Sequence, residues 1–288
     1  MPENTCPKPG IYEGVPFKTY QSWEAINNSL LWTLKTRSPY HAQWNKDHPS
    51  EDTPALLFGR GIHTFVLEPD LFASEFVIKP VCDRRTKVGN AIYTEFVETI
   101  TPEQSIITQD DLDAMEIING LIIEQGNHEI IESGRGELSI VWEDPETGLL
   151  CKGRIDYERD WKDNHYITDL KTTLNASYHK FQGSVATYGY YQQMAFYSWG
   201  WKILTGQDSI CTWLACEKAA PWVSMLWVAD DSTLVAGHNS FREALRKYAD
   251  CLEADEWPAY GEYERMKLPS WVMNQEGAFT ETFWNINS

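Results

Sequence analysis

The sequence predicts an α/β fold in which a mixed central sheet is flanked by helices and preceded by an N-terminal helical region. Three observations predict it. Apolar residues recur at helical spacing through about residues 20–130, the period changes to that of strands over about residues 136–171, and an aromatic-rich helical segment with two short apolar runs follows. With 288 residues, of which 42% are hydrophobic, the chain can bury a sizeable core, and we expect one domain over residues 1–288.

Helix start signals are frequent in the N-terminal region. Ser22 is a candidate N-cap, Thr53 precedes a proline, and Thr108 followed by Asp111 resembles a capping box. Each signal stands before apolar residues at helical spacing, and the helix that begins after Thr53 contains His63. The expected helices cover residues 22–37, a short segment from Ser38-Pro39, residues 53–68 and residues 108–125.

A basic loop is expected within this region, after a short strand over residues 76–80. Residues 82–90 (CDRRTKVGN) have the composition of a loop. Arg84, Arg85 and Lys87 make it the densest basic cluster of the chain.

The strand-like period begins with a hairpin whose strands cover residues 137–142 and 149–157. A third strand over residues 166–170 follows a polar turn, and its alternation puts Asp169 and Lys171 on one face. Residues 136–228 are therefore the expected sheet-and-helix core. The other expected elements are a helix over residues 187–204, strands over residues 210–216 and 222–228, a closing helix over residues 230–251, and a tail over residues 256–288 that wraps over the core.

The composition argues against a membrane or secreted protein. No run approaches 18 apolar residues, and residues 1–20 lack an apolar signal core. The six cysteines form no CxxC pair, so neither a zinc ribbon, an iron–sulfur cluster nor a disulfide framework is expected. We expect a cytoplasmic protein with reduced thiols and no membrane association.

Two carboxylates and a lysine form the one recognisable chemical motif. Asp156 and Asp169 lie on neighbouring expected strands, and Lys171 follows the second carboxylate by two residues. Phosphodiester hydrolysis uses such a set, because carboxylates hold Mg²⁺, which activates water, and a lysine offsets negative charge that develops on the phosphate. Taken alone, a DxK triplet can also occur by chance on a surface strand.

The net charge of −18 opposes nucleic-acid binding, because the field of the whole protein repels phosphate. A short basic channel and bound metal ions would reconcile an acidic surface with a DNA substrate.

Four segments together resemble a known family. GRIDY (153–157), ITDLKTT (167–173), YGYYQQMAFY (188–197) and GRGIHTFVLEPDLF (59–72) are similar to the motifs of RecE-type exonucleases (exonuclease VIII). This is a branch of the PD-(D/E)xK fold, which is shared with the RecB nuclease domain and lambda exonuclease. The resemblance runs from about residue 27 to residue 218 and implies a restriction-endonuclease-like core.

The resemblance also implies roles for individual residues. Lys171 would be the catalytic lysine, Gln193 and Tyr197 match a QxxxY helix motif, and Glu137 stands near the place of an additional acidic residue. The implied metal ligands are His63, Asp156, Asp169 and the backbone carbonyl of Leu170. The DNA-contacting candidates are Arg84, Arg85, Lys87, Ser29 and Arg154.

Each of these residues also has a simpler structural interpretation. His63 lies in an apolar helix and could be a core histidine, Gln193 and Tyr197 could be packing residues, and the basic cluster could be a solvated loop.

The activity that the resemblance implies is Mg²⁺-dependent hydrolysis of linear double-stranded DNA, with Mn²⁺ as a substitute metal. It further implies processive 5′-to-3′ degradation by a homo-oligomeric ring and a RecT-like annealing protein as partner. Two alternatives stay open. One is a PD-(D/E)xK nuclease of other polarity or substrate, and the other is a catalytically silent scaffold that binds DNA ends.

Overall fold

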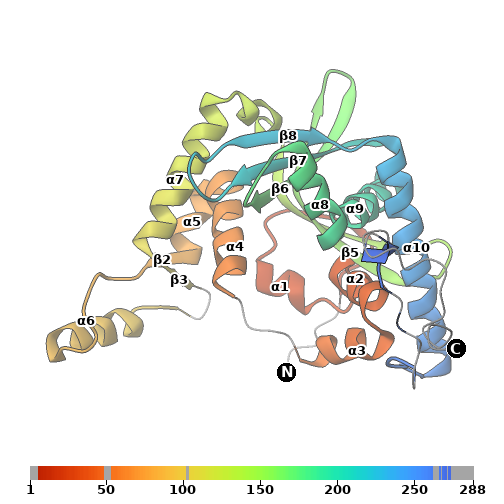
Figure 1. The fold of residues 1–288 in the computed structure, drawn as a ribbon, viewed down its shortest axis with the longest axis horizontal. Coiled ribbons are helices and arrows are strands. Elements are labelled where there is room, and N and C mark those ends of the chain that lie inside the picture. Colours follow the sequence, from red (N-terminus) through yellow and green to blue (C-terminus); the bar gives the residue numbers. More distant parts are fainter. Residues whose placement is uncertain are drawn as a thin grey trace, which may run out of the picture.

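A six-stranded sheet forms the centre of the protein in the computed structural model (Figure 1), which describes residues 6–48, 53–101, 104–261, 266, 268–270 and 272–273. The strand order is β1-β4-β5-β6-β7-β8, and only β6 and β7 pair in parallel. The strands are β1 (Gly10–Tyr12), β4 (Arg135–Glu143), β5 (Leu150–Trp161), β6 (Asn164–Thr173), β7 (Ser209–Glu217) and β8 (Ser224–Val228). The predicted mixed α/β architecture with an antiparallel hairpin is confirmed.

Helices cover both faces of this sheet. The helices are α1 (Phe17–Ser22), α2 (Asn28–Thr36), α3 (Pro39–Asp47), α4 (Pro54–Leu67), α5 (Pro69–Glu75), α6 (Lys87–Glu98), α7 (Gln109–Glu124), the 3₁₀ turn η1 (Asn127–Ile131), α8 (Tyr178–Tyr188), α9 (Tyr190–Thr205) and α10 (Asp231–Ala254). A separate parallel pair, β2 (Phe76–Ile78) with β3 (Ser105–Ile107), lies at the base of α6.

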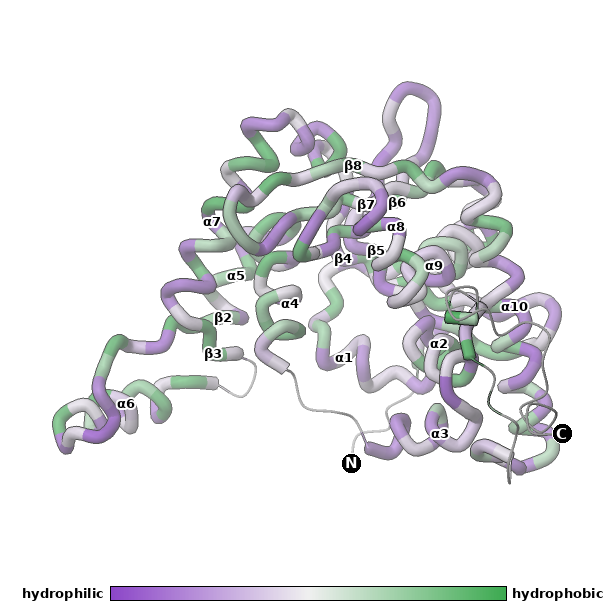
Figure 2. The backbone as a smooth tube through the Cα atoms, in the orientation of Figure 1, coloured by the Kyte–Doolittle hydropathy of each residue, from purple (hydrophilic) through white to green (hydrophobic). Residues whose placement is uncertain are grey.

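Two hydrophobic cores hold the helices to the sheet. Trp142, Phe196 and Phe241 belong to the larger core, which joins β4 to α9 and α10. Ile62 and Leu214 belong to the second core, in which α4 and α7 pack against β6 and β7. The green, apolar stretches of the backbone in Figure 2 run through these helices and strands. Because helices pack on both faces, the sheet is a rigid support for the side chains that its central strands carry.

Most helix starts predicted from the sequence are confirmed. The side chains of Ser38, Thr53 and Asp230 accept hydrogen bonds from backbone amides of the first turns of α3, α4 and α10. Thr108 and Asp111 form a reciprocal capping box at the start of α7.

Three predicted elements are wrong in extent. Residues 22–37 are not one helix, because Ser22 ends α1 and Asn27 caps a new helix, α2. Residues 187–204 are divided at Gly189, whose φ of 71° ends α8 before α9 begins. The basic loop ends at Thr86, which caps α6. The elements that the sequence did not predict are α1, α5, α6, α8, η1, β1 and β3.

The segment after α10 begins along the core, as predicted. Trp257 packs on Tyr248 with ring centroids 5.2 Å apart, and the Pro258 carbonyl accepts a hydrogen bond from the Tyr40 amide. Most of the predicted tail lies outside the described residues. None of the helices in the described ranges is long and apolar enough to cross a membrane.

Two glycines in helices should respond in opposite ways to alanine. A methyl group on Gly237 of α10 would overlap the carbonyl oxygen of Tyr191 in α9, whereas one on Gly120 of α7 would meet open space. Gly237→Ala should therefore lower the free energy of unfolding by about 1–3 kcal/mol, and Gly120→Ala should raise it by about 0.5–1 kcal/mol. Urea unfolding followed by circular dichroism measures both, and equal effects would contradict this account of the packing of α9 on α10.

Candidate active site

The site lies where β5 and β6 stop pairing. Their ladder runs from Trp161 and Asn164 to Tyr157 and Thr168, and the next residues on the two strands are Asp156 and Asp169. Beyond this point the Leu170 amide donates to Asp156 Oδ2 at 2.8 Å, so a side chain takes the place of a strand carbonyl. The separation leaves both carboxylates buried between the strands and the flanking helices.

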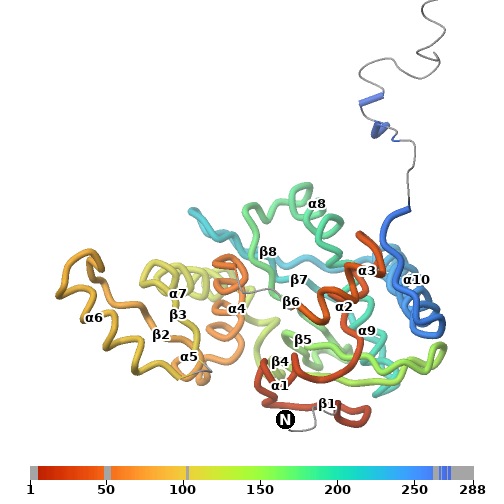
Figure 3. Tube along the Cα trace, turned by 90° about the horizontal axis from the view of Figure 1, so that it is seen from below, coloured from red at the N-terminus to blue at the C-terminus, as the bar shows by residue number. Residues whose placement is uncertain are grey.

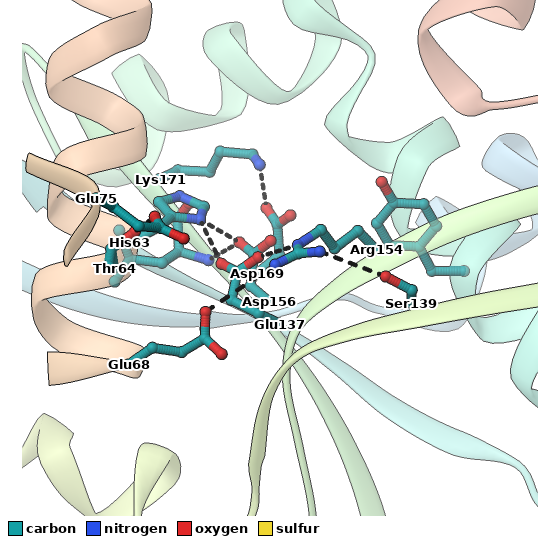
Figure 4. A network of polar contacts seen from close by, with 12 residues as sticks. His63, Thr64, Glu68, Glu75, Glu137, Ser139, Arg154, Asp156, Asp169 and Lys171 are labelled. Atoms are coloured by element: carbon teal, nitrogen blue, oxygen red, sulfur yellow. Dashed lines mark hydrogen bonds and ion pairs between the residues drawn. The ribbon is translucent and has the colours of Figure 1, made fainter. Parts of the chain in front are cut away.

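His63 approaches these carboxylates from α4 (Figure 4). Its Nε2 lies 2.8 Å from the carbonyl oxygen of Leu170, and its Nδ1 lies 3.5 Å from both Glu137 Oε1 and Asp156 Oδ2. The helix is fixed in this position because the neighbouring Ile62 is fully buried in the core with α7. Possible ligand atoms of His63, Glu137 and Asp156 lie within 4.8 Å of one another, which is close enough to share one metal ion.

Asp169 and Lys171 lie on one face of β6, as the alternation of the strand predicts. Asp169 Oδ2 is 2.7 Å from Lys171 Nζ, while Leu170 between them turns into the opposite core. Asp169 is 2% exposed and forms an ion pair with Lys171. Its two oxygens have more lone pairs than this one contact uses, and a buried carboxylate of this kind is suited to a cation.

Mutual repulsion of the carboxylates shows in the ionisation of the site. Burial, together with the nearby Asp169 and Glu137, raises the pKa of Asp156 to about 7, although His63 and Lys171 act to lower it. Burial alone would lower the pKa of His63, but Asp156 and Glu137 raise it to about 9. Burial also opposes the charge of Lys171, yet Asp169 and Asp156 hold its pKa above the usual value.

This donor set fits a hard divalent cation. Carboxylate and carbonyl oxygens with one imidazole are ligands that Mg²⁺ and Mn²⁺ accept. His63, Glu137 and Asp156 are the residues that the geometry groups for this purpose. Asp169 and the Leu170 carbonyl were also predicted as ligands. Asp169 contacts Lys171 and the Leu170 carbonyl contacts His63, and the role of both as metal ligands stays a prediction.

Glu137 has an unusual backbone conformation, and Arg154 binds its carboxylate. Its φ of 50° is unusual for a residue other than glycine. Arg154 Nε donates to Glu137 Oε2 at 2.5 Å, and Nη1 donates to the carbonyl of Val15 at 2.7 Å. Arg154 is only 12% exposed along its side chain. It was predicted to contact DNA, and that contact stays a prediction; in the structure its guanidinium contacts these protein acceptors and positions the Glu137 carboxylate.

Gln193 and Tyr197 lie together on α9. Gln193 Nε2 donates to the hydroxyl of Tyr197 at 3.2 Å, as their i, i+4 spacing allows. The ring of Tyr197 packs against Gly153 so closely that a methyl group there would overlap it. Tyr197 therefore also has a packing role that fixes α9 on β5.

Three residues near the site were missed by the sequence analysis. The ring of Tyr190 lies 4.9 Å from Lys171 Nζ, and Tyr190, Gln193 and Tyr197 share the i, i+3, i+7 spacing that could have revealed it. Glu68 Oε2 lies 4.0 Å from Arg154, and Glu75 accepts a hydrogen bond from Thr64 beside His63. No sequence signal distinguishes these two glutamates from surface residues.

The remaining predicted DNA contacts lie away from the metal-ligand group. Arg84, Arg85 and Lys87 are exposed on the segment around the start of α6, which projects from the body in two perpendicular views (Figures 1 and 3). The guanidinium of Arg84 lies 4.0 Å from the ring centroid of Tyr93, and Arg85 pairs with Asp83. Ser29 is exposed in the first turn of α2. The structure does not bring these residues together with His63 and Asp156.

Comparison with solved structures supports the fold. A protein from Eubacterium rectale, described as a "Putative exonuclease", superposes with a TM-score of 0.59 at 15% identity, over 89% of this chain and 94% of that one. A second structure, SSO0001, shares 15% identity over 65% of this chain and 86% of its own, but its TM-score of 0.26 supports no argument. No curated protein matches the chain significantly.

The family model named PDDEXK-like domain of unknown function (DUF3799) matches residues 30–269. That range contains every residue of the metal-ligand group together with Asp169 and Lys171. The chain belongs to the PDDEXK-like DUF3799 family and has a nuclease fold.

Proposed function

We propose that this protein is a Mg²⁺-dependent exonuclease that hydrolyses linear double-stranded DNA. The observation that carries the proposal is the convergence of Asp156, Asp169, Lys171 and His63 at the point where β5 and β6 separate. The motif resemblance to RecE-type exonucleases supports DNA as the substrate and a 5′-to-3′ polarity. A homo-oligomeric ring, a RecT-like annealing partner and a cytoplasmic location complete the proposal on the same ground.

The residues of the site have separable tasks in this proposal. His63, Glu137, Asp156 and Asp169 would hold the cation, which would lower the pKa of a water molecule and stabilise negative charge on the phosphate. Lys171 keeps its ammonium charged beside Asp169, where it can bind a phosphate oxygen and offset the charge that develops on it. Arg154 holds the Glu137 carboxylate in place.

The acidic composition is compatible with DNA only where cations gather. Lys171 and Arg154 lie inside the site, and Arg84, Arg85 and Lys87 provide a second cationic surface on the projecting segment. Because surface carboxylates repel phosphate elsewhere, binding should be confined to these places, and it should weaken with salt in proportion to the phosphate contacts that their cations make.

Five DNA substrates test the proposal. Purified protein is incubated with Mg²⁺, Mn²⁺, Ca²⁺ or EDTA and with linear duplex, relaxed circular duplex, single-stranded DNA, linear duplex blocked at both 5′ ends, or linear duplex blocked at both 3′ ends. We expect mononucleotide release from linear duplex with Mg²⁺ or Mn²⁺, its loss on 5′ blocking, and no release with Ca²⁺ or EDTA. Cleavage of circles would indicate an endonuclease, loss on 3′ blocking would reverse the polarity, and binding without any cleavage would indicate a silent scaffold.

A further inference from the structure

Two tyrosine rings lie in a row between Lys171, the candidate catalytic lysine, and solvent. Lys171 Nζ lies 4.9 Å from the ring centroid of Tyr190, and that ring lies 5.7 Å from the ring of Tyr188. The two tyrosine rings are tilted by 31°, and Tyr188 is 60% exposed. Tyr190 packs against the larger hydrophobic core, whereas Tyr188 is not one of its residues, so the ring of Tyr188 is the one that a ligand can reach from solvent.

The backbone between these rings is tightly constrained. Gly189 ends α8 and caps α9 in the left-handed conformation, with φ of 71°. A methyl group there would overlap the ring of Trp32, which packs edge-on against Tyr191 with centroids 6.0 Å apart. The chain must therefore turn here, and the turn fixes the directions in which Tyr188 and Tyr190 leave the backbone.

We propose that Tyr188 and Tyr190 form a stacking platform for a nucleobase of the DNA strand whose phosphate lies at Lys171. The inference rests on the proposed nuclease function and adds the group that the site recognises beside the phosphate. An ammonium group and an aromatic face side by side match the two halves of a nucleotide, an anionic phosphate and a flat base. Stacking accepts any base, so the platform positions the strand without reading its sequence.

A duplex end provides the base that such a platform needs. A base at the end of a duplex has one stacking neighbour only, so separating it from its partner costs less than inside the helix. Tyr188, which is exposed next to the site, can replace that neighbour. The platform therefore favours DNA ends over internal positions, which is the preference that an exonuclease requires.

Removing one base at a time from the DNA tests the platform. The wild-type protein is mixed in Ca²⁺ with linear duplexes that carry an abasic site, or a fluorescent 2-aminopurine, at the first, second or third position of either strand end. Fluorescence anisotropy gives the Kd, and quenching of 2-aminopurine reports stacking. We expect the wild type to bind at least one abasic duplex roughly tenfold more weakly than the intact duplex, with quenching at the same position.

Substitutions of Tyr188 test whether its ring causes the difference in Kd between intact and abasic duplexes. Tyr188→Ala should bind intact and abasic duplexes equally and lose the quenching, whereas Tyr188→Phe should keep both effects, because stacking needs the ring and not the hydroxyl. Tyr178→Ala is the matched control. Tyr178 is 56% exposed on the same helix but packs beside Trp227, so it should behave as the wild type.

The outcomes separate this inference from the proposed function. If Tyr188→Ala cleaves linear duplex and still binds the abasic duplex more weakly than the intact one, as the wild type does, the platform is overturned and the nuclease proposal stands. If the wild type binds abasic and intact duplexes equally and still cleaves DNA, the platform is likewise overturned and the nuclease proposal stands. A wild-type protein that neither binds nor cleaves DNA would overturn both proposals.

Discussion

Replacing Asp169 by asparagine should reduce DNA cleavage by about 10³-fold or more while leaving the protein folded. Asparagine has nearly the same shape, so the ladder of β6 with β7 and the packing around Trp213 are preserved. What is lost is the negative charge that pairs with Lys171 and one of the two acceptor oxygens of the carboxylate. Single-turnover rates on end-labelled linear duplex in Mg²⁺ measure the effect, and wild-type rates in the variant would remove Asp169 from the site.

The same aspartate-to-asparagine substitution at another place in the β5–β6 hairpin is the control. Asp163 is exposed in the β5–β6 turn with φ of 63°, a conformation that asparagine also tolerates. Asp163→Asn should therefore cleave DNA at the wild-type rate. The pair of variants differs only in whether the lost carboxylate faces the site.

Metal binding gives the same variant a second readout. In EDTA, Asp169→Asn should be about as stable as the wild type, because it relieves repulsion from Asp156 but leaves Lys171 without its partner. In Mg²⁺, the wild type should gain stability as the cation binds the folded state alone, and the variant should gain less. Thermal unfolding with increasing Mg²⁺ measures the difference.

Local sequence signals predicted much of the fold, because several elements are defined by residues next to one another. The capping box of Thr108 and the strand alternation around Asp169 are such signals, and both are confirmed. The division of α8 from α9 was missed, because Gly189 in a helical pattern is often tolerated. Its place against the ring of Trp32, which lies far away in the sequence, leaves no room for a side chain and could not be predicted.

The candidate site was predictable only in part for the same reason. Asp156, Asp169 and Lys171 follow from strands that are adjacent in sequence, and His63 was added through the motif resemblance. The protein contacts of Arg154 could not be predicted, because its sequence position gives no information about its direction. In the fold it turns toward Glu137 of the neighbouring strand β4 and toward Val15, and the second contact forms only when the N-terminal segment packs on the hairpin.

The stability of the hairpin that carries Asp156 depends on a buried ion pair at its other end. Asp144 is 0% exposed in the turn between β4 and β5, and one of its oxygens accepts from Arg242 of α10. The other accepts from the amide of Thr147 at 2.9 Å and from its hydroxyl at 2.8 Å. Burial raises the pKa of Asp144, but the hydrogen bonds from Arg242 and Thr147 outweigh it and hold the pKa below the ordinary value.

Asp144→Ala should therefore lower the free energy of unfolding by about 3 kcal/mol, near the lower limit for breaking a buried pair. The lower limit applies because Arg242 keeps a second partner, Glu146, at 2.5 Å. The depressed pKa means that this stabilisation is present above about pH 4 and is lost as the pH falls through the folded-state pKa. Urea unfolding at pH 7 and pH 3 should thus show a smaller difference between variant and wild type at the lower pH.

Two further variants distinguish burial of the pair from its charge. Asp208→Ala breaks an exposed pair with Lys202 at 2.6 Å and should cost less than about 1 kcal/mol, because solvent screens that pair. Asp144→Leu combined with Arg242→Met should recover part of the loss, since apolar side chains leave no unpaired buried charge. Equal costs for Asp144→Ala and Asp208→Ala would mean that the turn and α10 are not held together by this contact, and the hairpin would then need another anchor for the strand that carries Asp156.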